Sequence, residues 1–216
     1  MIKISINPEK TFMQPKYLCK SLLFCFVLIS TIGNAADNLI DHKLPINTGG
    51  IYRAQNAVPI ALGAIVFAGA LWEGSEDRLG STFWKSSEAF VASGVLAEGL
   101  KRVTGRESPS ASDSANNWFK SSSNGSFPSA HVTVTAAAVT PFIMEYKDDH
   151  PWVMALAALP AYEMVARVKA QEHWQSDVLA GGLLGVAVGV YEQKRDKSWF
   201  VTMLPKGAFI GFRKTM

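Results

Sequence analysis

Cysteine is almost absent from this chain of 216 residues: Cys19 and Cys25 are the only two. Beyond them the chain can form neither a disulfide nor a zinc site made of thiolates. Charged residues are also few, at 18%, whereas hydrophobic residues make up 48%. The length predicts one domain with a substantial core. Beyond residue 36 there is no set of apolar runs of about 20 residues, the length that crosses a bilayer.

Residues 1–36 have the pattern of an export signal. Four lysines precede an apolar run from Ser21 to Gly33, and Gly33 and Ala35 are small residues at the −3 and −1 positions. We therefore expect cleavage after Ala35 and a single mature domain over residues 37–216. The alternative is a signal that stays uncleaved as an anchor helix. Both cysteines lie in this segment, so a cleaved chain has no thiol.

The mature chain has a balanced charge. Cleavage removes four lysines and Glu9, which takes 21 basic residues to 17 and 18 acidic residues to 17. The net charge of +3 therefore belongs to the signal. A chain without a basic surplus has no electrostatic basis for nucleic-acid binding, and we expect no nucleic-acid partner.

The rest of the sequence predicts an all-α fold, a bundle of about five to six main helices. Ala57–Trp72 is apolar but only roughly 15 residues long, which favours a buried core helix over one that dips into a membrane. A loop over Thr104–Phe127 is rich in Ser, Gly, Asn and Asp, and loops of this length are often functional. The other expected elements are helices over Ser81–Val103, Ser129–Tyr146, Trp152–Lys169 with a kink at Pro160, and His173–Tyr191, and a possible short β-hairpin over Trp199–Arg213.

One short segment carries much of the candidate chemistry. Arg167, His173 and Asp177 are separated by six and then four residues. If a helix includes the last two, both side chains lie on one face, and the carboxylate can accept one ring N–H. The other ring nitrogen is then basic and free to act as a nucleophile. An arginine nearby can hold an oxyanion such as phosphate through two hydrogen bonds.

Two further clusters add anion-binding groups. Lys101 begins the segment Lys-Arg-Val-Thr-Gly-Arg-Glu-Ser-Pro, and Ser129 and His131 lie in the first turn of a predicted helix. Free backbone N–H groups at a helix start bind anions, and the Ser129 hydroxyl adds a donor. His131 is suited to protonate a leaving oxygen.

These three clusters resemble the three signatures of the type 2 phosphatidic acid phosphatase (PAP2) superfamily. That family includes bacterial acid phosphatases and vanadium haloperoxidases. Its signatures are Lys, six residues, Arg-Pro; Pro-Ser-Gly-His; and Ser-Arg, five residues, His, three residues, Asp. All three occur in order between residues 101 and 177.

The resemblance implies a role for each matching residue. His173 would be the nucleophile that forms a phosphohistidine, Asp177 its orienting carboxylate, and His131 the general acid and later the base. Lys101, Ser129, Arg167 and the backbone N–H of Ala130 would bind the phosphate.

Three positions depart from the family pattern. Ala130 replaces Gly and Ala166 replaces Ser, and both substitutions keep a small residue. Ser108 stands where the first signature has Arg, so one charged hydrogen bond to phosphate is missing. Such a bond is worth about 1.5–3 kcal/mol. Arg106 or Arg102 is the expected substitute, and Lys120 is a weaker one.

Phosphoryl transfer by these residues needs no metal or other cofactor, because positioning and charge neutralisation supply most of the catalysis. A metal site made of His131, His173 and Asp177 is the competing interpretation. It lacks a compact ligand motif such as H-E-x-x-H. It would also place Lys and Arg beside a cation.

The sequence therefore predicts a metal-independent histidine phosphatase of the bacterial cell envelope. Its apolar helices favour a lipid-linked substrate at the membrane surface, such as phosphatidic acid, phosphatidylglycerol phosphate or undecaprenyl pyrophosphate. The location is periplasmic, either soluble and touching the membrane or embedded in the inner membrane. The alternatives are a broad-specificity acid phosphatase for small soluble phosphate esters, a vanadate-dependent haloperoxidase, and a phosphate-binding envelope protein with a weakened or inactive site.

Overall fold

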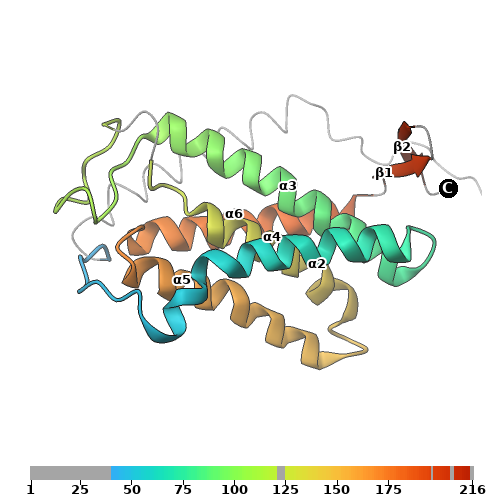
Figure 1. Ribbon diagram of the computed structural model, residues 1–216, viewed down its shortest axis with the longest axis horizontal. Coiled ribbons are helices and arrows are strands. Elements are labelled where there is room, and N and C mark those ends of the chain that lie inside the picture. The colour runs from blue at the N-terminus through green and yellow to red at the C-terminus, as the bar shows by residue number, and fades with distance from the viewer. Residues whose placement is uncertain (1–39, 121–124, 196, 205–206, 215–216) are drawn as a thin grey trace, which may run out of the picture.

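A computed structural model describes residues 40–120, 125–195, 197–204 and 207–214, so the expected signal segment lies outside the described residues. The described chain is a helical bundle, as the sequence predicts (Figure 1). Its elements are the 3-10 helix η1 (Gly50–Asn56), the helices α2 (Ala57–Glu73), α3 (Arg78–Thr104) and α4 (Ala130–Tyr146), the 3-10 helix η2 (Pro151–Ala157), the helices α5 (Ala158–Lys169) and α6 (Gln175–Lys194), and the strands β1 (Lys197–Leu204) and β2 (Gly207–Lys214).

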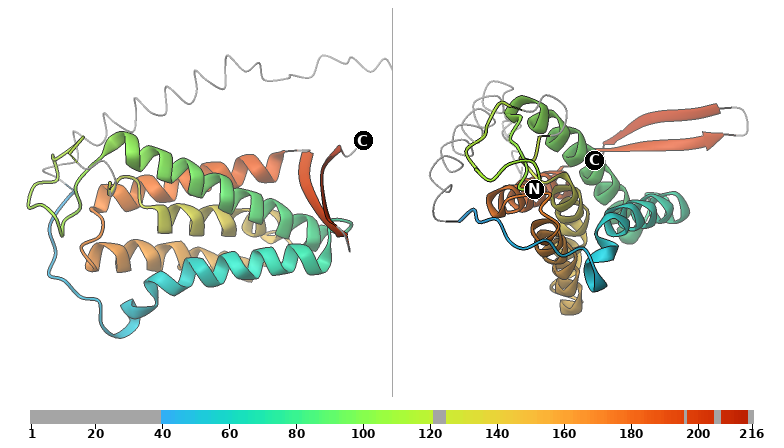
Figure 2. Two further views of the ribbon diagram at one scale, coloured as in Figure 1. Left: turned by 45° about the horizontal axis from the view of Figure 1, so that its top comes forward. Right: turned by 60° about the vertical axis from the view of Figure 1, so that its left-hand side comes forward.

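Helix α4 is the centre of the bundle. It packs against α2, α3, α5 and α6, which surround it along its length (Figure 2). Small side chains allow this close packing, because Ala136, Ala137 and Ala138 are all buried. The start of α4 is thereby held at one end of the bundle, beside the end of α5 and the start of α6.

Glycines on α6 allow α4 and α6 to approach closely. A Cβ atom added at Gly181 would lie 2.7 Å from the Ser129 carbonyl oxygen, and one at Gly185 would lie 2.3 Å from the Thr133 carbonyl oxygen. The Ser129 N–H also donates to the Asp177 carbonyl oxygen over 3.0 Å. The second and third signatures are therefore in direct contact.

Helix α2 is peripheral, so the prediction of a buried core helix is wrong. Its buried residues form one narrow stripe with a spacing of three to four residues, made up of Pro59, Gly63, Val66 and Ala70. Large apolar side chains face outward, and Trp72 is 88% exposed. With η1 it forms a helical segment, Gly50–Glu73, whose most apolar window of 18 residues has a mean hydropathy of 1.6, so that by length and composition the segment could cross a membrane.

Small polar side chains occupy much of the interior, while apolar side chains cover much of the outside. Ser86, Ser93 and Thr133 are fully buried, whereas Val95 and Leu183 are more than 70% exposed. Small and hydroxyl-bearing residues at helix interfaces with apolar outer faces are typical of helices in lipid.

Two predicted details need correction. The chain before α5 is not one kinked helix, because the 3-10 helix η2 ends at Ala157 and α5 starts at Ala158. Pro160 lies in the first turn of α5, where a missing N–H breaks no helical hydrogen bond. Pro141 lies inside α4, which the sequence reading did not single out.

The C-terminal hairpin has two antiparallel strands, with Lys197 opposite Lys214 and Leu204 opposite Gly207. It lies at the end of the bundle opposite to the 105–120 loop, as Figures 1 and 2 show. Its expected turn residues Pro205 and Lys206 lie outside the described residues.

Candidate active site

The three signatures meet at one end of the bundle because each lies at the end of a helix. Lys101 is in the last turn of α3, which ends at Thr104, one residue beyond the predicted end, with Gly105 in the left-handed conformation at φ 50°. Arg167 is in the last turn of α5, and His173 lies in the connection to α6. A cavity of about 630 Å³ is lined by Lys101, Arg167 and His173.

The ring of His173 is held by a backbone carbonyl. The side chain is buried, and its Nδ1 atom lies 2.6 Å from the Ser126 carbonyl oxygen. A carbonyl only accepts, so Nδ1 carries the hydrogen and Nε2 keeps its lone pair. Burial lowers the pKa of His173, although the charge of Asp177 opposes this effect. The ring is thus held in one tautomer, with the Nε2 lone pair available for bonding.

Asp177 does not hold the ring by the predicted hydrogen bond, because α6 starts at Gln175 and leaves His173 outside the helix. The Asp177 Oδ2 atom lies 3.8 Å from Nδ1 of His173 and accepts the Trp174 N–H over 2.9 Å. Burial alone would raise the pKa of Asp177, but His173 and Arg106 outweigh it and lower the pKa. Asp177 therefore supplies negative charge near the ring, while Ser126 supplies the acceptor.

His131 is half-buried at the second position of α4. Burial lowers its pKa to about 4, and the positive charges of Arg167, His173 and Lys101 act in the same direction. These electrostatic contributions indicate that His131 lies near the three residues that line the cavity. At neutral pH its ring is therefore uncharged.

The two cations of the site are partly desolvated. Burial lowers the pKa of both Lys101 and Arg167. The Arg167 Nη1 atom donates to Asn56 Oδ1 over 3.0 Å, and its Nη2 atom lies 3.7 Å from Oε2 of the exposed Glu172. Burial raises the pKa of Glu163, one turn earlier on α5, to about 7, although Arg167 opposes the shift.

The second signature contributes to the site mainly through the backbone at the start of α4, and less through the serine side chain. Ser129 is the N-cap of α4, is fully buried and uses its N–H for the Asp177 carbonyl. Its hydroxyl oxygen has no hydrogen-bond partner within the described part of the chain. Ala130 and His131 are the first two helical residues, whose N–H groups have no partner inside the helix. They give the site the positive end of the helix dipole.

Comparison with known proteins decides the family. The model of the PAP2 superfamily matches residues 83–199, which is more than half of the chain and includes all three signatures. The chain belongs to the PAP2 superfamily.

Two relatives can be named. Over 65 residues the chain is 35% identical to the lipid A 1-phosphatase of Porphyromonas gingivalis, a match that covers 30% of this chain and only 15% of that protein. Among solved structures, the transmembrane PAP2-type phosphatidylglycerolphosphate phosphatase of Bacillus subtilis is similar at 16% identity with a TM-score of 0.47, over 81% of this chain and 93% of that one.

Arg106 is placed away from the phosphate cavity, which corrects its assignment to the phosphate-binding residues of this PAP2 protein. Its side chain is fully buried, and its guanidinium lies 2.6 Å from carboxylate oxygens of both Asp41 and Asp177. Its Nε atom donates to the Ala115 carbonyl over 2.9 Å. These contacts direct its charge toward the two carboxylates and away from a ligand.

Serine hydroxyls occupy the place of the missing PAP2 arginine. Ser108 lines the cavity, and its Oγ atom lies 2.8 Å from Oγ of Ser110, which lines it too. Ser126 and Glu172 also line the cavity, and the sequence reading did not assign either to the site. Ser126 acts through its backbone carbonyl, and the sequence does not indicate which backbone carbonyl contacts His173. Within the described ranges, no group of three or more His, Cys, Asp or Glu could hold a metal ion.

Proposed function

We propose that this PAP2 protein is a metal-independent phosphatase of the bacterial cell envelope that removes phosphate from lipids through a phosphohistidine. The observation that carries the proposal is His173, whose Nδ1 hydrogen is committed to the Ser126 carbonyl while the ring lines a cavity with Lys101 and Arg167. A neutral imidazole beside two cations is suited to attack a phosphate and to neutralise its charge.

The reaction has two steps. In the first, Nε2 of His173 attacks phosphorus, the bond to the leaving oxygen breaks, and His131 passes a proton to that oxygen. In the second, His131 takes a proton from water, the water oxygen bonds to phosphorus, and the N–P bond breaks. Lys101, Arg167 and the start of α4 hold the phosphate oxygens in both steps.

The outer surface favours a lipid substrate. Gly50–Glu73 can span a bilayer by its length and hydropathy, and the helices α3, α5 and α6 carry exposed Val95, Val165 and Leu183. Large exposed apolar patches are rare on water-soluble proteins and mark contact with a membrane or another protein. We infer that the apolar faces contact lipid and that the His173 cavity opens at the polar end of the bundle, on the periplasmic side.

The test compares two substrates on the purified full-length protein in detergent micelles without added metal. We expect phosphate release from phosphatidic acid or phosphatidylglycerol phosphate to have a kcat/KM at least about tenfold above that for p-nitrophenyl phosphate, because lipid binding adds apolar contacts. Equal or faster turnover of the soluble ester would favour the acid-phosphatase alternative. No turnover of any ester, including undecaprenyl pyrophosphate, would contradict the proposal.

A pH profile of kcat/KM provides a second test. Because the pKa of His131 is about 4, the free enzyme at neutral pH has no proton to give, and the substrate monoanion must bring it. The second pKa of a phosphate ester is about 6. We expect kcat/KM to fall on both sides of a range from about pH 4 to about pH 6, by about tenfold per pH unit above it. A flat profile between pH 6 and pH 8 would refute this proton source.

A further inference from the structure

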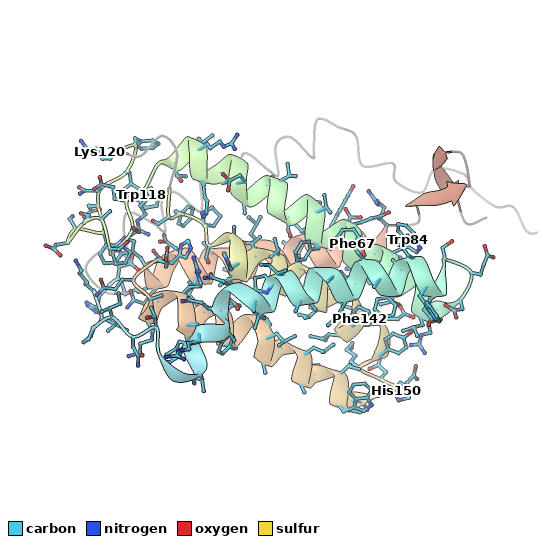
Figure 3. All side chains as sticks on the ribbon, viewed as in Figure 1. Phe67, Trp84, Trp118, Lys120, Phe142 and His150 are labelled. Carbon is cyan, nitrogen blue, oxygen red and sulfur yellow. The ribbon has the colours of Figure 1, made fainter. Side chains whose placement is uncertain are left out.

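A buried cluster of three charged side chains lies directly behind the proposed nucleophile. Arg106 Nη1 contacts Oδ1 of Asp177, and Arg106 Nη2 contacts Oδ2 of Asp41, each over 2.6 Å, and all three side chains have zero exposure. The rings of Trp118 and Trp174 lie 4.5 and 5.8 Å from the guanidinium carbon. Figure 3 shows Trp118 at the loop end of the bundle. Two carboxylates and one guanidinium give this buried cluster a net charge of −1.

Asp41 also caps the helix that follows the nucleophile. Its Oδ1 atom accepts the Ser176 N–H over 2.7 Å, and its Oδ2 atom accepts the Ser176 hydroxyl over 2.6 Å. Asp177 accepts the Trp174 N–H at the same helix start. A segment 135 residues away in the sequence therefore satisfies a free amide of α6.

The N-terminal arm around Asp41 is fastened to the segment that contains His173. The His42 carbonyl accepts from Nε2 of Gln175 over 2.8 Å, and the Leu44 carbonyl accepts from Nε2 of Gln171 over 2.6 Å. Leu44 packs against the apolar cluster of Val132, Val168 and Val178. The arm thus contacts both sides of His173, at residues 171 and 175.

We propose that Asp41 is a positioning residue that acts on His173 through Arg106 and Asp177. The inference rests on the proposed phosphatase function. Arg106 fixes the Asp177 carboxylate 3.8 Å from Nδ1, so that it does not rotate and compete with the Ser126 carbonyl. Asp41 offsets the charge of Arg106, so that the cluster stays negative. When Nε2 takes a phosphoryl group the ring becomes positive, and a negative cluster beside Nδ1 stabilises that charge.

The matched variants are Asp41→Asn and Asp113→Asn. Asp113 pairs with Lys43 of the same arm over 2.5 Å and is 92% exposed, so its loss removes a carboxylate without changing the buried cluster. For D41N we expect an about tenfold lower kcat with KM within about twofold, because one buried charge near the ring is lost. For D113N we expect kcat within twofold of the unsubstituted protein.

Orthovanadate binding followed by calorimetry gives a readout that does not depend on turnover. The stoichiometry of vanadate binding counts the sites that can bind an anion, and kcat is expressed per such site. A fraction of unfolded protein therefore does not lower this kcat. Vanadate bound to His173 resembles the transition state, and we expect D41N to weaken its binding about tenfold and D113N to leave it unchanged. If D41N does not fold, Asp41→Glu and Asp41→Gln can be compared instead. Their side chains have equal length, and only D41E keeps the negative charge. We expect D41E to be more active than D41Q.

The outcomes separate the two proposals. A D41N protein with unchanged kcat per site and unchanged vanadate affinity overturns the role of Asp41 and leaves the phosphatase proposal intact. An unsubstituted protein that neither turns over phosphate esters nor binds vanadate overturns the phosphatase proposal itself. Unsubstituted activity together with a D41N defect in both readouts supports both.

Discussion

Replacing His173 with alanine is expected to lower phosphate release by at least about 10⁴-fold, because the reaction loses the atom that attacks phosphorus. The loss should appear in kcat, since Lys101, Arg167 and the start of α4 still bind the phosphate. The measurement is steady-state phosphate release at saturating substrate. In parallel, the protein is mixed with labelled substrate and the reaction is quenched rapidly without acid. A labelled phosphoprotein should form with the unsubstituted protein and not with H173A.

His150→Ala is the matched control. His150 is exposed and lies at the end of the bundle away from the 105–120 loop (Figure 3). It stacks on Tyr146, the last residue of α4, at 6.2 Å between ring centroids, and the proposed site lies at the other end of that helix. We expect H150A to keep its activity within about twofold. An H173A protein with more than a tenth of the original kcat would exclude His173 as the nucleophile.

Replacing His131 with asparagine is expected to reduce kcat/KM by about 10²–10⁴-fold for an alkyl phosphate, the range that a general acid supplies. The loss of kcat/KM, which reports the first step, should be much smaller for p-nitrophenyl phosphate, because a nitrophenolate leaves without a proton. With that ester the first step stays fast while water activation is slow, so kcat still falls and phosphohistidine should accumulate in H131N. The comparison needs kcat/KM for both esters and the amount of phosphoprotein for one.

The leaving-group dependence distinguishes chemistry from structure at His131. A purely structural defect would lower the rates for both esters by the same factor and would lower the thermal midpoint of unfolding. Equal losses for alkyl and nitrophenyl esters would therefore remove His131 from the role of general acid. A larger loss for the alkyl ester cannot arise from misfolding alone.

Three of the residues that the sequence assigned to the site line one cavity. They are Lys101, Arg167 and His173, although 72 residues separate the first from the last along the chain. Arg106 is turned away from this cavity. Spacing shows that a side chain two residues from Ser108 is within reach of the cavity, but not which way it turns. Its direction is set by Asp41, 65 residues earlier, and by Asp177, 71 residues later.

Helix α2 shows a second limit of sequence reading. An unbroken apolar run predicts a helix that avoids water, and both a protein core and a bilayer satisfy that requirement. The structure has only a narrow stripe of α2 buried against the bundle, around Gly63 and Val66. The described residues leave the remaining apolar face of α2 uncovered, and this distinguishes a peripheral helix from a core helix.

The sequence by itself determined the helical fold and the set of proposed reacting groups, because apolar periodicity and the choice of two histidines, a lysine and an arginine are properties of local segments. The tertiary structure alone decided that the Ser126 carbonyl fixes the His173 tautomer, that Arg106 joins Asp41 to Asp177, and that α2 faces outward. Every residue has a backbone carbonyl, so the sequence does not show which carbonyl accepts a given hydrogen bond. Burial and ion pairing depend on neighbours far away in the chain. These contacts form only when the whole bundle packs.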